Sequence, residues 1–376
     1  MSESSGLARA RRRGWMPLWL LAWLCLAPAL RAELRVLFIG NSFTFGYGST
    51  TDVPDLFDRL ARAGGQDDPV TLMRTISGKD FQWHAGDSGT LAAINERPWT
   101  HVILQNYSTE PTHLTSIGGK SIADHLTFGR ALYQQVMANH SHCNVVLFET
   151  WSRAASHTLI TGTSTGSSFA STAQFQNELR TNYRLLRDNL NKEFPDAPPV
   201  SVALVGSTWE RAGALLPLSD PGFVDLFMPN ESPQYGYHAN DCGTYLAACV
   251  FYAQLYESNP VGLHMDTLIG SLNLNFGSDP GMPAYLEAKA WEMTQPPGPE
   301  FKATTTLTPF GDIQLSWPSR DGMLYNVRAS DNPAGDPSTW AVIESAIPPS
   351  GIGNNTTNFS LSGPRRFFVI EEYAAP

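Results

Sequence analysis

The chain has 376 residues, and its 35 acidic and 25 basic side chains give a formal net charge of −10 at pH 7. This balance argues against nucleic acid and anionic membranes as partners, because both are bound through basic patches. The length exceeds what one hydrophobic core usually serves, so we expect two domains.

The first 32 residues have the pattern of an export signal. Four arginines lie between positions 9 and 13, residues 15–30 are apolar, and Ala27, Ala29 and Ala32 offer cleavage sites. The apolar stretch has 16 residues, which is short for a membrane span of about 20, although an uncleaved anchor is the alternative. We predict a signal peptide over residues 1–32 and a secreted or periplasmic chain. Its removal takes away five arginines and one glutamate and shifts the formal net charge to −14.

Buried-strand patterns alternate with helical patterns between residues 33 and 293. Short apolar runs without polar alternation are typical of parallel strands that are covered on both faces. The predicted strands are residues 36–39, 70–73, 102–104, 144–148 and 200–205. The predicted helices include residues 53–60, 128–139, 175–194 and 245–256. This order predicts an α/β domain with a parallel, doubly wound sheet.

A different pattern follows residues 294–300, a segment rich in proline that we predict to be a linker. Over residues 301–376, strand patterns at 313–317, 324–328 and 367–370 alternate with Gly, Pro, Asp and Asn turns. These features predict a small C-terminal all-β sandwich. It resembles modules attached to exported bacterial hydrolases. We assign its aromatic residues to core packing, with glycan contact as the alternative.

Ser42 is the leading candidate nucleophile. It follows the first predicted strand in the sequence Gly40-Asn41-Ser42, and α/β sheets bind ligands outside the carboxyl ends of their strands. Two alternatives are open. A serine at this position can cap a helix without chemistry, and Gly40, Gly46 and Gly48 suggest a nucleotide-binding turn, although the lysine of a P-loop is absent.

Three further segments follow predicted strands or precede the last helix. Gly78 lies after the second strand, Gln105 and Asn106 end the third, and His238 precedes the final helix of the domain. With the sequence GNSFT around Ser42, these segments resemble the blocks of the SGNH hydrolases, the GDSL-like esterase superfamily. The resemblance covers residues 34–262 and is nearest to exported bacterial members of the GNSFT type.

The resemblance implies a three-layer α/β/α, flavodoxin-like sandwich and a serine-hydrolase site that needs no cofactor or metal. Ser42 would attack an ester carbonyl, and His238 would take its proton and pass it to the leaving alcohol. The oxyanion would be bound by the backbone N–H groups of Ser42 and Gly78 and by a side-chain amide. Asn106 is preferred over Gln105 for that amide.

Three other residues have a structural and a chemical interpretation. His84 stands where relatives often carry a histidine, and we assign it to ordering the Gly78 loop rather than to catalysis. Trp151 and Trp209 either line the substrate pocket or pack in the core.

The sequence departs from the family where the triad acid is expected. Relatives usually carry an aspartate three residues before the histidine, and this chain has Tyr235 there. The enzyme works without a side-chain acid, it uses a different acid, or it has lost activity. The acids nearest in sequence are Asp241, Asp225 and Glu231.

The predicted function is that of an exported serine esterase that hydrolyses carboxylic esters, with short acyl groups such as acetyl on carbohydrate as preferred substrates. Its predicted partners are small-molecule or carbohydrate esters, without nucleic acid and without a membrane once the signal is cleaved. The alternative is an inactive hydrolase scaffold that binds glycan or a surface. A carboxylate within hydrogen-bonding reach of His238 Nδ1 favours the enzyme.

Overall fold

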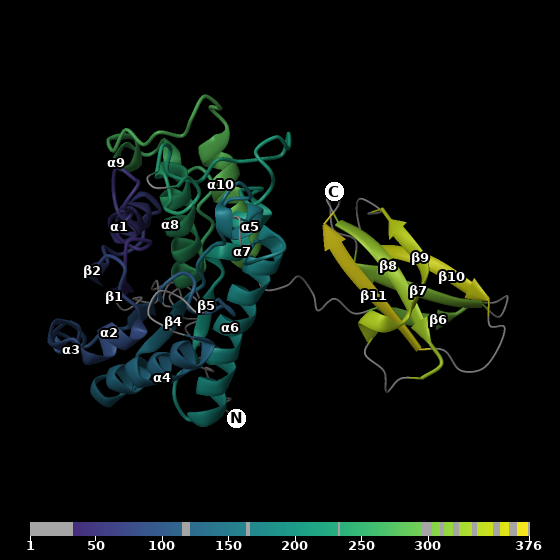
Figure 1. Cartoon of the computed structure of the whole chain (residues 1–376), viewed down its shortest axis with the longest axis horizontal. Helices are drawn as coiled ribbons and strands as arrows, with labels where there is room; N and C mark the ends of the chain where they lie inside the picture. The colour runs from purple at the N-terminus through teal and green to yellow at the C-terminus, as the bar shows by residue number, and fades with distance from the viewer. Residues whose placement is uncertain are drawn as a thin grey trace, which may run out of the picture. The chain divides into compact units, whose positions relative to one another are not determined.

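The computed structural model describes residues 33–114, 121–162, 166–231, 234–294, 303–308, 312–318, 323–332, 337–348, 354–360 and 367–374. The predicted signal peptide and nearly all of the predicted linker lie outside these residues. The chain divides into two compact units between Thr294 and Gln295, and each unit is described by itself (Figure 1).

The first unit is built on a five-stranded parallel sheet with the strand order β2-β1-β3-β4-β5. The strands are β1 (Arg35–Gly40), β2 (Val70–Thr75), β3 (His101–Leu104), β4 (Asn144–Phe148) and β5 (Ser201–Ala203). This is the flavodoxin-like doubly wound order, in which the chain changes direction between β1 and β3. The predicted fold class of this unit is confirmed.

Helices cover both faces of the sheet (Figure 1). Alternate residues of β1 feed two separate cores, with Val36 and Phe38 in one and Leu37 and Ile39 in the other. The first core also contains residues from α1 (Val53–Ala63), α7 (Val205–Arg211), α8 (Asp241–Tyr256) and α10 (Met282–Thr294). The second contains residues from α2 (Phe81–Gly86), α3 (Ser88–Asn95), α4 (Ile122–Asn139) and α6 (Thr172–Glu193). Short helical turns are α5 (Thr158–Thr161), η2 (Leu263–Met265) and α9 (Thr267–Gly270).

Side-chain caps define where the helices next to the site begin. Asp52 accepts the N–H of Asp55 at the start of α1, and Asn240 accepts that of Gly243 at the start of α8. Because Asp52 is the cap of α1, Ser42 is not a helix cap. The fifth strand is shorter than predicted, since β5 ends at Ala203 and Val205 begins α7.

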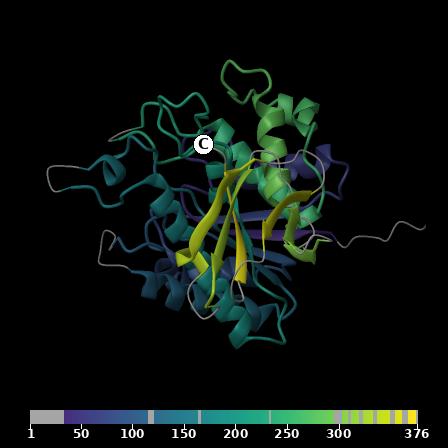
Figure 2. The same cartoon turned by 90° about the vertical axis from the view of Figure 1, so that its right-hand side faces the viewer.

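The second unit is an antiparallel β region (Figure 2). It contains two three-stranded sheets with the orders β10-β7-β6 and β11-β8-β9. Their strands are β6 (Thr304–Leu307), β7 (Asp312–Pro318), β8 (Met323–Ser330), β9 (Ala341–Ile347), β10 (Asn354–Ser360) and β11 (Phe367–Ala374), with the 3₁₀ turn η3 (Pro337–Thr339) before β9. Leu315 and Trp317 from one sheet share a core with Tyr325 and Val327 from the other.

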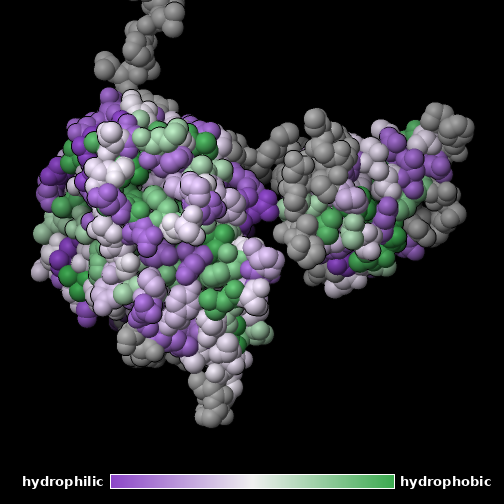
Figure 3. Space-filling view, turned by 90° about the horizontal axis from the view of Figure 1, so that it is seen from above, coloured by the Kyte–Doolittle hydropathy of each residue, from purple (hydrophilic) through white to green (hydrophobic). Residues whose placement is uncertain are grey.

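Polar and apolar residues are interspersed on the molecular face that Figure 3 displays. Among the described residues, no helix has the length and apolar character needed to cross a membrane. The same residues include no group of three or more His, Cys, Asp or Glu side chains that could hold a metal ion. Cys143, Cys242 and Cys249 are buried and free.

Candidate active site

The nucleophile turn, residues 41–49, leaves the carboxyl end of β1. Thr44 and Phe45 donate their backbone N–H groups to Asn41 O at 2.9 and 3.2 Å, and the N–H of Tyr47 reaches Ser42 O at 3.2 Å. These bonds close the turn on itself and place Ser42 beside the β1–β3 switch point, where sheets of this order bind their ligands.

Two buried amides hold the nucleophile turn in place: Gln105, directly after β3, and Asn41, in the turn itself. Gln105 is fully buried, and its Oε1 accepts the N–H of Asn41 at 2.8 Å and the Thr44 hydroxyl at 3.1 Å. Asn41 Nδ2 in turn donates to Lys79 O at 2.8 Å. Gln105 therefore ties the end of β3 to the turn, and Asn41 ties the turn to the loop that carries Gly78.

His84 supports the same turn from α2. Its Nε2 lies 2.9 Å from Gly40 O and its Nδ1 lies 2.9 Å from the Thr90 hydroxyl. The carbonyl accepts a hydrogen bond only, so Nε2 carries the proton of the neutral ring. Burial lowers the pKa of His84 to about 4, although the bond to Gly40 opposes this shift. A neutral, fully buried ring fits a positioning role rather than proton transfer.

Ser42, His238 and Glu231 form a continuous hydrogen-bonded chain. His238 Nε2 lies 2.8 Å from Ser42 Oγ, and His238 Nδ1 lies 2.5 Å from Glu231 Oε1. The other carboxylate oxygen, Oε2, accepts the backbone N–H groups of Tyr237 and His238 at 2.9 and 3.0 Å. A nucleophile, a base and an orienting acid in this order are the geometric signature of a serine hydrolase site.

The two other candidate acids make contacts elsewhere. Asp225 Oδ1 accepts the hydroxyl of Tyr235 at 2.7 Å. The carboxylate of Asp241 accepts bonds from Ser49, Thr50 and Asn275. The residue at the family's usual acid position, Tyr235, thus directs its hydroxyl to Asp225 rather than to the histidine.

The histidine loop, residues 226–240, brings Glu231 back to His238 because its two ends pair. Met228 N donates to His238 O at 2.8 Å, and Asn240 N donates to Leu226 O at 2.9 Å. Glu231 lies between these paired ends, and its carboxylate reaches Nδ1 of the ring. Gly236, with φ of 95°, packs so closely on Ala154 that a Cβ there would collide with it.

A buried cation lies beside this loop and was not predicted from the sequence. Arg153 is 3% exposed, donates to Ser108 Oγ at 2.8 Å and lies 4.1 Å from the centroid of the Tyr237 ring. Burial lowers the pKa of Arg153, and its attraction to neighbouring groups that include Glu231 opposes the shift. The guanidinium and the Glu231 carboxylate, which is 8% exposed, thus attract each other in this buried part of the site.

The two backbone donors predicted for the oxyanion are available. In the part of the chain that the structure describes, the N–H groups of Ser42 and Gly78 have no hydrogen-bond partner. Gly78 has φ of +68°, and a Cβ there would meet no atom within 4 Å. The positive φ, rather than crowding by the protein, is the reason for glycine at this position.

Asn106 is fully buried and already bonded on both sides of its amide. Its Oδ1 accepts the backbone N–H groups of Phe81 and Tyr107 at 2.9 and 2.8 Å, and its Nδ2 lies 2.9 Å from His125 Nδ1. An amide nitrogen carries two protons. Burial raises the pKa of the Glu110 carboxyl, and a hydrogen bond from the Asn106 side chain opposes this shift, so the second N–H faces Glu110. The amide nitrogen of Gln105 donates to Asn106 O.

Trp151 and Trp209 lie in the core. Both are fully buried, and their rings stack with centroids 4.1 Å apart. Trp151 also stacks on Phe43 at 4.5 Å. The stacked rings of Trp209 and Trp151 therefore pack against Phe43, the residue after Ser42.

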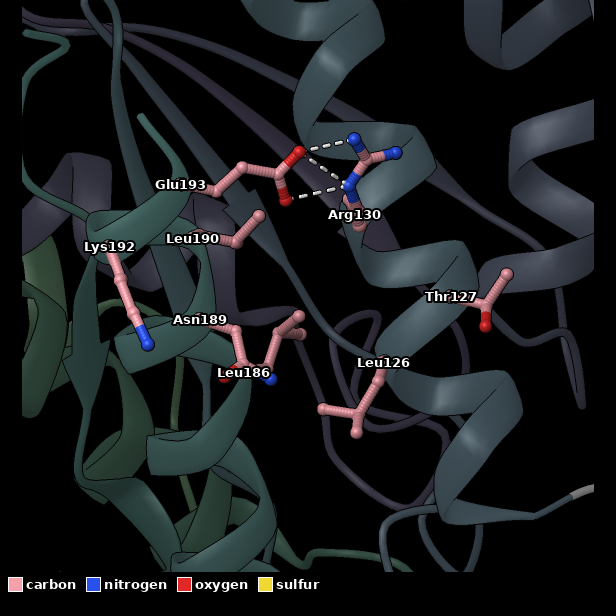
Figure 4. A pocket seen from close by; sticks show the side chains of 8 residues that line it. All are labelled: Leu126, Thr127, Arg130, Leu186, Asn189, Leu190, Lys192 and Glu193. Atoms are coloured by element: carbon pink, nitrogen blue, oxygen red, sulfur yellow. Dashed lines mark hydrogen bonds and ion pairs between the residues drawn. The ribbon is translucent and has the colours of Figure 1, made fainter. Parts of the chain in front are cut away.

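An open pocket of about 480 Å³ lies between α4 and α6 (Figure 4). Arg130 and Glu193 form an ion pair across it, with Nε 2.7 Å from Oε2. Its lining residues are Leu126, Thr127, Arg130, Leu186, Asn189, Leu190, Lys192 and Glu193. None of them belongs to the Ser42–His238–Glu231 chain.

The fold of the first unit agrees with the one that the resemblance to SGNH hydrolases implies. The sheet order is the flavodoxin-like one that the resemblance implies, and Ser42 and His238 meet at its switch point. The specific bacterial subtype stays a prediction.

No protein-family model and no curated protein matches the sequence. Solved structures of similar shape include a lipase/acylhydrolase from Enterococcus faecalis, with 11% identity, a TM-score of 0.39 and coverage of 60% of this chain and 96% of that one. A carbohydrate esterase family 3 structure from Talaromyces cellulolyticus has 14% identity, a TM-score of 0.40 and coverage of 60% and 97%. The salicylyl-acyltransferase SsfX3 from a tetracycline biosynthetic pathway has 14% identity, a TM-score of 0.37 and coverage of 58%, and this chain spans 53% of its length.

Proposed function

We propose that the chain is a serine esterase that hydrolyses carboxylic esters through an acyl-enzyme. The observation that carries this proposal is the chain of hydrogen bonds from Ser42 Oγ through His238 to Glu231, at 2.8 and 2.5 Å. The scaffold alternative depends on an unsupported imidazole and a covered Ser42. Glu231 supplies the support to the ring, while Ser42 itself is 4% exposed. The nucleotide alternative loses its basis because Asp52 already caps the helix that follows the turn.

The reaction follows from the positions of these groups. Ser42 Oγ forms a bond to the ester carbonyl carbon while His238 Nε2 takes its proton. The bond to the alcohol then breaks, and His238 returns the proton to the leaving oxygen. Water, deprotonated by the same nitrogen, releases the acid from Ser42. Glu231 fixes the ring's orientation and stabilises the imidazolium that forms in each half-reaction.

The oxyanion in each step would be bound by the N–H groups of Ser42 and Gly78, and the Asn106 amide is the third donor that the family resemblance implies. Loss of one such donor typically costs about 100- to 1000-fold in rate. Substrates with a short acyl group, such as acetyl on carbohydrate, follow from the family resemblance and the predicted export through residues 1–32.

The test is release of p-nitrophenol from its acetate and butyrate esters by residues 33–376. Ser42→Ala and His238→Ala are each expected to lower kcat by at least about 1000-fold, with acetate preferred over butyrate by the unaltered protein. Ser88→Ala, at an exposed serine on α3, is the matched control and is expected to keep full activity. Equal rates for the unaltered protein and Ser42→Ala would contradict the proposal.

A further inference from the structure

Tyr47 combines high exposure with direct contact to the base. Its side chain is 58% exposed, although the centroid of its ring lies 4.7 Å from that of His238 at a tilt of 41°. Its other ring contact in the described residues is Phe45, at 6.4 Å. The hydroxyl has no hydrogen-bond partner in those residues. Both a ring face and a hydroxyl are therefore available to a ligand next to His238.

The backbone under this exposed ring is fixed. Tyr47 N is bonded to Ser42 O at 3.2 Å, and a Cβ on the following residue, Gly48, would lie 2.5 Å from Ala239 O. Just beyond, Asp241 accepts the Ser49 hydroxyl at 2.7 Å and the N–H of Thr50 at 2.6 Å. A side chain mounted on such a backbone loses little freedom on binding, which favours affinity.

The position of Tyr47 decides which part of an ester it can contact. His238 Nε2 returns its proton to the alcohol oxygen, so the alcohol must lie next to the imidazole, while the acyl group lies at Ser42 and the oxyanion donors. Two other rings adjoin His238, but both are engaged by the protein. Tyr237 packs against Arg153 at 4.1 Å, and Phe43 is 2% exposed and stacked on Trp151.

We propose that Tyr47 binds the alcohol part of the ester and selects alcohols that contain a pyranose ring. A pyranose offers an apolar C–H face to the Tyr47 ring and hydroxyl groups to its free phenol. This assignment rests on the proposed esterase function and adds the residue that recognises the leaving group. Tyr47 is thus a specificity residue beside the catalytic pair.

Two esters with the same acyl group test the proposal. An acetylated methyl xylopyranoside carries the ring, and ethyl acetate does not. Tyr47→Ala is expected to raise KM for the xylopyranoside ester about 3- to 10-fold, the range of single aromatic contacts, and to leave kcat/KM for ethyl acetate within about twofold. Tyr47→Phe keeps the ring and is expected to stay closer to the unaltered protein. Met265→Ala, at a side chain that is 78% exposed outside the site, is the control.

An equal loss on both esters, or no change on the xylopyranoside ester, would overturn the assignment. A second measurement separates it from the esterase proposal. In a Ser42→Ala background, binding of methyl β-xylopyranoside is followed by NMR titration, with and without Tyr47→Ala. A loss of at least about threefold in affinity supports the role of Tyr47 even if neither ester is hydrolysed. Equal binding, or none in either protein, overturns it.

Discussion

The nucleophile turn and the histidine loop meet at Ser42 and His238 but are shaped by different means. The turn is one short segment that is closed by its own backbone hydrogen bonds. Gln105 and His84 stabilise it through hydrogen bonds from neighbouring elements. The loop takes its shape from the pairing of its two ends and from one carboxylate, Glu231, that accepts three hydrogen bonds.

This difference explains how the acid can change its place in the sequence while the nucleophile keeps its motif. The serine must leave a particular strand at a particular point, so its local sequence is restricted. The acid only has to deliver an oxygen to Nδ1, and any loop that folds back on the histidine can do so. Here the spacing is seven residues, instead of the three usual in the SGNH hydrolases that the sequence resembles.

The largest effect is expected from Glu231→Gln. The amide is similar in size but cannot stabilise the imidazolium, and the corresponding change in a well-studied triad lowers kcat about 10,000-fold. We expect a loss on the order of 1000- to 10,000-fold in kcat with little change in KM. Steady-state kinetics on p-nitrophenyl acetate measure it, with Asp225→Asn as the matched control. A comparable loss in Asp225→Asn, or none in Glu231→Gln, would show that the acid is misassigned.

A smaller effect is expected from Asp241→Asn, because this carboxylate joins the two regions. Asp241 lies in the first turn of α8, directly after the histidine loop, and accepts hydrogen bonds from Ser49 at the end of the nucleophile turn and from Thr50 just after it. Hydrogen bonds to a charged group contribute about 1.5 to 3 kcal/mol each, so we expect the variant to lose about 2 kcal/mol of unfolding free energy at pH 7.

The pH dependence of this loss has a definite sign. Burial alone would raise the pKa of Asp241, but the donors from Asn275, Thr50 and Ser49 hold it below its ordinary value of 3.8. Its contribution is therefore present above that value and is lost as the pH falls through the folded-state pKa. Urea unfolding at pH 7 and pH 3 should show a gap between the two proteins that narrows in acid. A gap that stays constant would refute the charged network.

His84→Gln tests the hydrogen bonds by which the buried His84 ring supports the nucleophile turn. The pKa of His84 is about 4 in the folded protein against an ordinary 6.5, so the unfolded chain binds more protons between these values. Stability must rise with pH across this window. The variant should lower that slope by up to about 1.4 kcal/mol per pH unit, as unfolding at pH 4.5, 5.5 and 6.5 would show. An unchanged slope would mean that the ring is not buried in its neutral form.

The smallest effect is expected from Tyr235→Phe. Only the bond from its hydroxyl to Asp225 is lost, which is expected to cost about 1 kcal/mol of unfolding free energy. Because this hydroxyl does not face the imidazole, kcat should stay within about twofold of the unaltered value. A loss of 100-fold or more would place Tyr235 in the support of His238 and erase the contrast with Glu231.

The sequence predicted the strands of the first unit well because each is a short apolar run between turn residues. Residues 144–148 match β4 from end to end, and residues 36–39 lie within β1. The fifth strand was predicted too long because its apolar run continues to Val205. In the structure this valine is buried as the first residue of α7 instead. Apolar character alone does not distinguish the two.

Ser42 and His238 were predicted from local motifs, although they are 196 positions apart and meet at 2.8 Å only in the folded protein. The parts of the site that local motifs did not identify depend on contacts between distant segments. Glu231 was one of three open candidates because no spacing rule describes how far the loop extends between its paired ends. Arg153 follows β4 without a motif of its own, so only its burial beside Tyr237 reveals it.

The most direct test of the central claim uses a fluorophosphonate, whose phosphorus forms a bond to the reactive serine oxygen as fluoride leaves. Mass spectrometry identifies the labelled residue, and the labelling rate is compared for residues 33–376, His238→Ala, Glu231→Gln and Asp225→Asn. We predict a single adduct on Ser42, formed slowly in His238→Ala and Glu231→Gln and at the full rate in Asp225→Asn. Labelling at another residue, or an unchanged rate in Glu231→Gln, would contradict a Ser42–His238–Glu231 triad.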